Sequence, residues 1–223
     1  MKMQSGFTLI ELAMVLVIVG LLLGGVLKGQ ALINSAKVRN MATDFKNVQV
    51  YVYAYQDRFR SLPGDDSLVA THLNGGTRAT NGTQANGVIE GAWNTATDGD
   101  ESCVFWQHVR LAGLAPGVTA VNCAAGNAYQ PRNADEGLIG IQGVSGFTTI
   151  TRNAASATVA MSGANVVCSA GVLGKYAKQL DTMLDDGEAD TGSMRVADPA
   201  SAGQSITSFA IMDSTPYTVC MAV

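Results

Sequence analysis

The feature that most constrains this chain is an unbroken apolar run near its start, FTLIELAMVLVIVGLLLGGVL, at residues 7–27. A helix of about 20 apolar residues is long enough to cross the hydrocarbon core of a bilayer. The run contains one charged residue, Glu11. A charge inside a membrane span is expensive and indicates a function with a named partner, unless the side chain reaches the interface from the end of the run. The residues alone leave both interpretations open for Glu11.

The segment before the apolar run is short, MKMQSG, and the run continues directly into a long polar helical stretch. An ordinary secretory signal peptide has a basic start, a shorter apolar core and a small-residue cleavage site after that core. We therefore expect the apolar run to stay in the mature protein as a membrane anchor.

Gly6 followed by FTLIELAMVLVIVG resembles the signature of type IV prepilins and of the related type II secretion pseudopilins. The resemblance implies that a prepilin peptidase cuts between Gly6 and Phe7 and methylates the new amine of Phe7. It also implies that Glu11 neutralises this amine in a neighbouring subunit as the chains pack into a filament. An ammonium and a carboxylate buried together relieve each other's desolvation, whereas a wrong register leaves both unpaired.

The apolar helix departs from many pilins, which carry a proline where this chain has Lys28. It has four glycines instead, at positions 20, 24, 25 and 29. Glycine weakens a helix by up to about 1 kcal/mol relative to alanine. The glycines therefore mark either a stretch that bends on assembly or a surface for close helix packing.

Beyond the anchor, apolar residues recur at a 3-4 spacing that indicates one apolar face of a continuing helix. These seam residues are Val38, Met41, Phe45, Val48, Val52, Tyr55 and Phe59. Pro63 marks the stop, so one helix is predicted over 7–60. The seam predicts either a coiled coil with another chain or docking on the chain's own head, and we favour docking because three heptads are short for an independent coil.

The predicted organisation is a leader at 1–6, a long helix at 7–60 and a globular head at 61–223. The helix divides into an assembly stem, 7–27, and an amphipathic part, 28–60, that packs on the head. After a loop at 61–100 the head is predicted to contain helices at 101–113 and 172–184. Strands are predicted at 138–144, 147–151, 157–161, 206–212 and 217–222. The fold class is therefore α+β, a pilin-like long helix on a small antiparallel sheet.

The head is acidic: residues 61–223 contain seven Lys/Arg and fifteen Asp/Glu. Because such a surface repels phosphate backbones, no nucleic-acid partner is expected. The sequence also contains no phosphate-binding loop of the G-x-x-x-x-G-K-[ST] type and no H-E-x-x-H metal motif. We expect the chain not to be an enzyme.

All four cysteines lie in the head, at Cys103, Cys123, Cys168 and Cys220. An even count outside the cytosol indicates two disulfides, for which three connectivities exist. We favour Cys103 with Cys123, which closes a local loop, and Cys168 with Cys220, which ties the second helix to the last strand.

An acidic run around a glycine turn is the candidate metal site, for which calcium is the expected ion because it prefers oxygen ligands. The resemblance adds to this, because some pseudopilins bind calcium in the C-terminal part of the head. The alternative is a solvated helix end. The candidate ligands are Asp181, Asp185, Asp186, Glu188 and Asp190.

The resemblance implies a structural subunit, major or minor, of a type IV pilus-like filament. Its partners would be copies of itself or related pilins, the prepilin peptidase and the inner-membrane assembly machinery. It would lie in the bacterial inner membrane before assembly and in a periplasmic or extracellular filament afterwards. A type II secretion pseudopilin and an adhesive, ligand-binding minor pilin are the alternatives.

Overall fold

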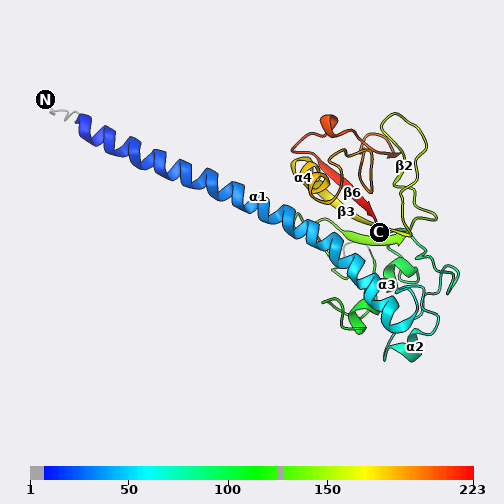
Figure 1. The fold of residues 1–223 in the computed structure, drawn as a ribbon. Helices are drawn as coiled ribbons and strands as arrows, with labels where there is room; N and C mark the ends of the chain where they lie inside the picture. The colour runs from blue at the N-terminus through cyan, green and yellow to red at the C-terminus, as the bar shows by residue number, and fades with distance from the viewer. Residues whose placement is uncertain (1–7, 125–127) are drawn as a thin grey trace. The chain divides into compact units, whose positions relative to one another are not determined.

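The computed structural model describes residues 8–124 and 128–223. The chain divides into two compact units, Met1–Lys37 and Val38–Val223. The helix α1, Leu9–Phe59, begins in the first unit and ends in the second, as Figure 1 shows in blue and cyan.

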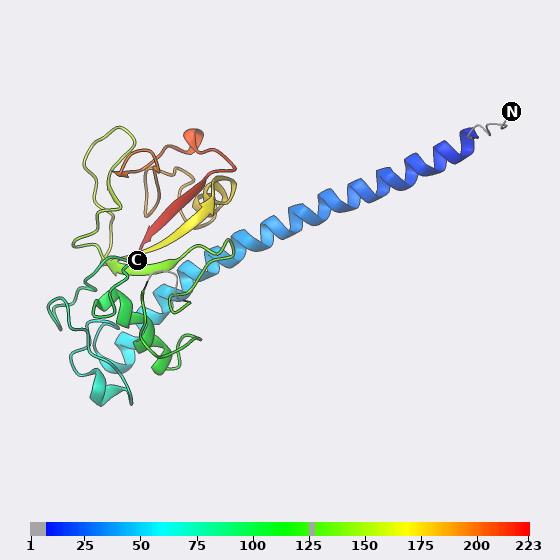
Figure 2. The same cartoon turned by 180° about the vertical axis from the view of Figure 1, so that it is seen from behind.

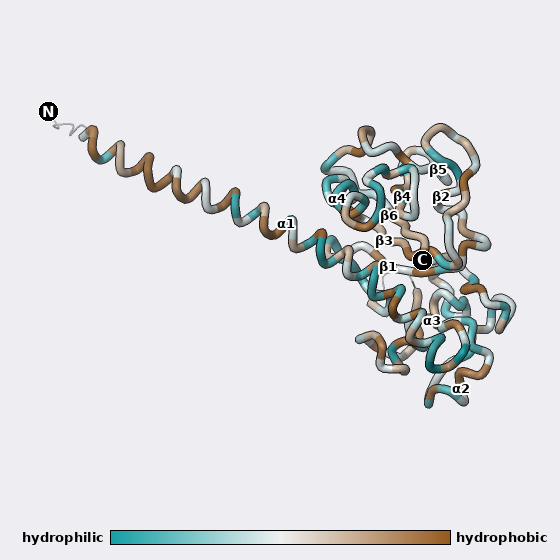
Figure 3. The backbone as a smooth tube through the Cα atoms, viewed as in Figure 1, coloured by the Kyte–Doolittle hydropathy of each residue, from teal (hydrophilic) through white to brown (hydrophobic). Residues whose placement is uncertain are grey.

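The first unit contains the apolar part of α1. An 18-residue window of this helix has a mean hydropathy of 2.6, and none of the window is buried. Figure 3 shows the corresponding turns in brown. By length and composition this helix is suited to cross a membrane.

In the second unit the seam predicted from the sequence faces the core of the head. Six of its seven residues are buried and the last, Phe59, is half-buried. Between them lie exposed residues such as Thr43, Lys46 and Tyr53, so one face of the helix is wet and the other dry. The head therefore uses α1 as one wall of its core.

A four-stranded antiparallel sheet forms the second wall of the core, with the strand order β1-β3-β6-β4. Figures 1 and 2 show β3 and β6 side by side at its centre. The strands are β1 (Ile139–Gly143), β3 (Asn165–Leu173), β4 (Met194–Ala197) and β6 (Pro216–Ala222). A long helix packed with a small antiparallel sheet is the predicted α+β fold, which is confirmed.

The two faces of the sheet have different neighbours because side chains alternate along a strand. Val167, Val219 and Met221 point into the cluster that contains the seam of α1. Val166 and Cys168 point to the other face, where Trp93 packs with Phe147, Ile150 and Met161. Loops therefore cover the face of the sheet that α1 does not.

The smaller elements complete the head around this core. Both α3 and α4 contribute side chains to the cluster that α1 joins. They are α2 (Val69–His72), α3 (Glu101–Leu111), α4 (Gly174–Leu184), β2 (Ile150–Arg152), β5 (Gly203–Gln204) and the 3-10 turn η1 (Ser208–Ala210).

Two disulfides join the pairs that the sequence analysis favours. Cys103 in α3 is bonded to Cys123, twenty residues later in the chain. Cys168 and Cys220 face each other directly across β3 and β6, with their Cα atoms 4.1 Å apart. The second bond thus links two neighbouring strands, whereas a link between helix and strand was expected.

Several predicted strands of the head are wrong. Residues 157–161 form no strand, and 206–212 contain the turn η1 instead of a strand. Within 147–151 only the end of the segment is extended, as the start of β2. The helix predicted from 172 begins at Gly174, because Val172 and Leu173 belong to β3. Short apolar runs do not distinguish a strand from a turn that buries one side chain, such as Ile211.

Candidate functional site

The N-terminal turn of α1 is organised by Thr8 and Glu11. The Thr8 N–H and hydroxyl donate to Glu11 Oε2, at 2.9 and 2.7 Å. The Glu11 N–H in turn donates to Thr8 Oγ1 at 3.3 Å. This reciprocal arrangement is a capping box, which satisfies backbone donors that the first turn of a helix leaves unpaired. The Thr-x-x-Glu spacing was readable in the sequence and was missed.

Glu11 is exposed in the single chain, and both of the next residues in its helix, Leu12 and Ala13, are exposed as well. One carboxylate in a long apolar surface has no solvent to hydrate it once such helices pack together or enter a membrane. It therefore needs a positive partner from outside its own turn. The predicted cleavage and methylation residues, Gly6 and Phe7, lie outside the described residues.

A family model of the prokaryotic N-terminal methylation motif matches residues 1–27. The chain carries a prepilin-type signature. This signature is that of type IV pilins and pseudopilins, and it implies processing by a prepilin peptidase and assembly into a pilin-like filament. No curated protein and no solved structure matches the chain.

In the head, the acidic residues predicted to bind calcium have different surroundings. Asp181, in α4, is fully buried, and neither of its carboxylate oxygens has a hydrogen-bond partner among the described residues. Asp185 Oδ2 accepts the Met194 N–H at 2.8 Å. Asp186 is exposed and accepts the Glu188 N–H and the Thr191 hydroxyl.

These carboxylates do not converge on one point. In residues 8–124 and 128–223, the one group of three His, Cys, Asp or Glu ligand atoms within 4.8 Å of one another is Asp98 with Cys103 and Cys123, and both sulfurs are in a disulfide. Among the predicted ligands that the structure describes, Asp181 is the one whose buried carboxylate oxygens have no hydrogen-bond partner. Calcium binding by the predicted set therefore stays a prediction, with Asp181 as the ligand that would gain most from an ion.

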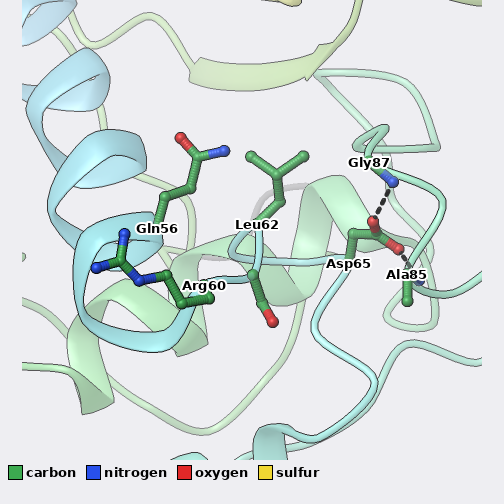
Figure 4. A pocket seen from close by; sticks show the side chains of 7 residues that line it. Gln56, Arg60, Leu62, Asp65, Ala85 and Gly87 are labelled. Carbon is green, nitrogen blue, oxygen red and sulfur yellow. Dashed lines mark hydrogen bonds between the residues drawn. The ribbon is translucent and has the colours of Figure 1, made fainter.

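A second candidate site is a pocket of about 450 Å³ at the end of α1 (Figure 4). Gln56 and Arg60 extend from the helix on one side, and Asp65 lies on the other side. The Asp65 carboxylate accepts the N–H of Ala85 and, at 2.7 Å, that of Gly87. The Asp65 carboxylate therefore holds the loop at residues 85–87 against the segment that follows α1.

A buried polar network lies beside this pocket and was not predicted from the sequence. Asp66 Oδ2 accepts the Tyr55 hydroxyl at 2.8 Å and lies 2.6 Å from His72 Nδ1. The Gly64 N–H donates to His108 Nδ1, and His108 Nε2 lies 2.8 Å from the Thr77 carbonyl. Burial is the main cause that lowers the pKa of His108. The network fastens the segment 63–77 to α1 and α3, which is a structural role.

Proposed function

We propose that this chain is a structural subunit, a major or minor pilin, of a type IV pilus-like filament assembled through its N-terminal helix. The observation that carries the proposal is the prepilin-type signature at residues 1–27 on a helix whose apolar window is entirely unburied. Outside the bilayer this surface must be covered by other stems, at roughly 25 cal/mol per Å² of apolar area kept from water, so the stems hold together once they are in a filament.

Glu11 supplies the specificity that apolar burial lacks. Peptidase cleavage before Phe7 would create an amine that the precursor does not have, and therefore a charge partner for Glu11 appears only after processing. The capping box engages Glu11 Oε2 with Thr8. The other carboxylate oxygen remains for the amine of a neighbouring subunit.

The test separates helix capping from pairing between subunits. Glu11→Gln keeps an acceptor for the Thr8 N–H, since Gln also serves in a capping box, but it removes the charge. We expect this variant to enter the membrane normally and to be incorporated into filaments at least about tenfold less, because breaking one buried ion pair costs about 3–5 kcal/mol. Membrane fractions and sheared filaments are compared by quantitative blotting.

Thr8→Val is the matched control, because it removes the hydroxyl of the capping box and leaves the carboxylate. We expect it to be incorporated at close to the normal level. Normal incorporation of Glu11→Gln would contradict the pairing role. Failure of the unaltered chain to enter any filament, in cells with a working assembly machinery, would contradict the proposed function itself.

A further inference from the structure

A second pocket, of about 200 Å³, lies between α1 and α3 within the head. Asp44 and Tyr51 line it from α1, Trp106 and Arg110 line it from α3, and Pro131 and Ile139 line it as well. A pocket of this size accommodates a single side chain. Its walls are mostly apolar, with a small number of polar side chains.

The buried polar group of this pocket is the Trp106 indole. Trp106 is only 2% exposed, and its Nε1–H has no acceptor in the part of the chain that the structure describes. Leaving a buried donor unsatisfied costs about 1–3 kcal/mol. The Nε1 atom is enclosed by the head itself, so this cost is internal to the head and a group that enters the pocket does not reach the N–H.

Asp44 is the second polar group without a direct partner. It is half-buried, and within the described ranges it makes no hydrogen bond or ion pair; the Tyr51 hydroxyl is the one group whose titration it affects. Burial raises the pKa of Asp44 to about 6. Burial is the sole cause of this rise, so no cation of the head offsets it.

Arg110 also lines the pocket, but in the part of the chain that the structure describes it makes no hydrogen bond or ion pair with Asp44. Its three nitrogens each donate to a carbonyl, of Pro116, Val118 and Tyr129. Its central carbon lies 5.8 Å from the centre of the Trp106 ring and 4.8 Å from that of Tyr129. The pocket thus has a carboxylate without a paired cation.

We propose that this pocket receives a basic side chain from α1 of a neighbouring copy, which pairs with Asp44 beside the Tyr51 ring. The inference rests on the proposed filament and names one contact within it. Lysine or arginine fits these walls, because the carboxylate of Asp44 attracts a cation and the face of an aromatic ring such as Tyr51 does so too.

The charge of the chain identifies the donor of that side chain. Residues 28–60 contain six Lys/Arg and two Asp/Glu, whereas residues 61–223 contain seven and fifteen. Lys28, Arg39 and Lys46 are exposed on α1. Asp44 lies on this basic stretch itself, so a basic side chain on α1 of a neighbouring copy can pair with it when copies pack side by side, and complementary charge fixes the register of such contacts.

The first experiment is photocrosslinking in assembled filaments. A benzophenone amino acid replaces Asn47, which is exposed and lines the pocket. We expect a covalent dimer of this chain, with the crosslink mapped by mass spectrometry to residues 28–46 of the second copy. A filament that yields no such dimer, or a crosslink only to a different protein, would overturn the proposal.

The second experiment compares the chain before and after assembly. Asp44→Asn should leave the melting temperature of the detergent-solubilised chain unchanged or raise it, since a half-buried unpaired carboxylate costs stability. The same variant should reduce filament yield at least about fivefold, a loss of about 1 kcal/mol. Asp57→Asn, at an exposed acid of the same helix, is the matched control and should change neither quantity.

The outcomes separate this inference from the proposed function. Normal filaments of Asp44→Asn would overturn the contact and leave the pilin assignment standing. A fall in both melting temperature and yield would also overturn it, because Asp44 would then act inside the subunit. Absence of filaments from the unaltered chain would instead contradict the assignment on which the inference depends.

Discussion

At the scale of residues, two acids five positions apart in the head have opposite surroundings. The exposed Asp186 accepts the N–H of Glu188 and the hydroxyl of Thr191, and these bonds lower the pKa of its carboxyl. The buried Asp181 has no partner at normal hydrogen-bond geometry. Burial raises its pKa to about 7 and outweighs the lowering effect of the Gly187 backbone N–H. The nearby carboxylates of Asp185, Asp186 and Glu188 add to the rise. The head therefore favours the neutral form of Asp181.

A pH dependence of stability follows from this pKa. The ordinary pKa of Asp181 is 3.8, so the folded state holds a proton that the unfolded state has released between about pH 4 and 7. Below pH 3.8 the carboxyl is protonated in both states and does not lower the stability of the head. The free energy of unfolding then falls as the pH rises from 3.8 through about 7. We expect Asp181→Asn to raise the free energy of unfolding by about 4 kcal/mol at pH 8 and to have little effect at pH 4. Denaturant unfolding at the two pH values measures the difference.

Calcium gives this prediction its control. An ion bound at Asp181 would stabilise the unaltered head and not the Asn variant, because binding to the folded state alone raises stability. Melting is therefore repeated at pH 8 with added calcium and with chelator. A melting temperature that calcium leaves unchanged would contradict the calcium prediction, and an Asn variant no more stable in chelator would contradict the cost of the buried carboxylate.

Features that depend on a repeating pattern along the chain were predicted from the sequence. Features that depend on contacts between distant segments were missed. The seam from Val38 to Phe59 was predicted because a helix repeats its apolar face every three to four residues. The lack of partners at Asp181 and Trp106 depends on what distant segments bring near them. No local pattern in the sequence contains that information.

At the scale of elements, the strands β3 and β6 hold the C-terminal end of the chain in the centre of the sheet. Six pairs of residues connect the two strands, and Cys168 opposite Cys220 joins them covalently. The last strand of the chain is therefore held by a bond that spans 52 residues of sequence.

The two disulfides should contribute unequally. In the loop-entropy picture a bond that closes about 50 residues stabilises by about 4 kcal/mol, and one that closes about 20 residues by about 3 kcal/mol. We expect Cys168→Ala with Cys220→Ala to lower the melting temperature more than Cys103→Ala with Cys123→Ala. Thermal unfolding followed by circular dichroism compares the two double variants, and the reverse order would contradict the loop-entropy account.

Helices were predicted better than strands for a physical reason. The bounds of α1 and α3 agree with the predictions to within about two residues, because their apolar spacing and stop signals are local. The central strand β3 has five consecutive buried residues at its start, so it lacks the alternation that identifies a half-exposed strand. Its partner strands are what make it a strand, and they lie far away in sequence.

At the scale of the whole molecule, the opposite charges of 28–60 and 61–223 lie on one chain. Screening by salt weakens contacts between such exposed charges.

The mature protein provides the most direct test of the prepilin-type signature. We expect the chain from sheared filaments to begin at Phe7 with a methylated amine, because the signature implies cleavage after Gly6. Intact mass and N-terminal sequencing measure this, with the chain from cells that lack the prepilin peptidase as the control. A filament subunit that still begins with Met1 would contradict the processing.

The helix α1 serves both as the anchor and, through Val38 to Tyr55, as a wall of the head's core. A protease that cuts the chain after this helix therefore does not release an intact head, because it removes the six buried α1 residues of the main core cluster. Release of an intact head requires a cut before Val38. The membrane anchor and the head share the helix α1, so replacing one of them requires redesign of the other.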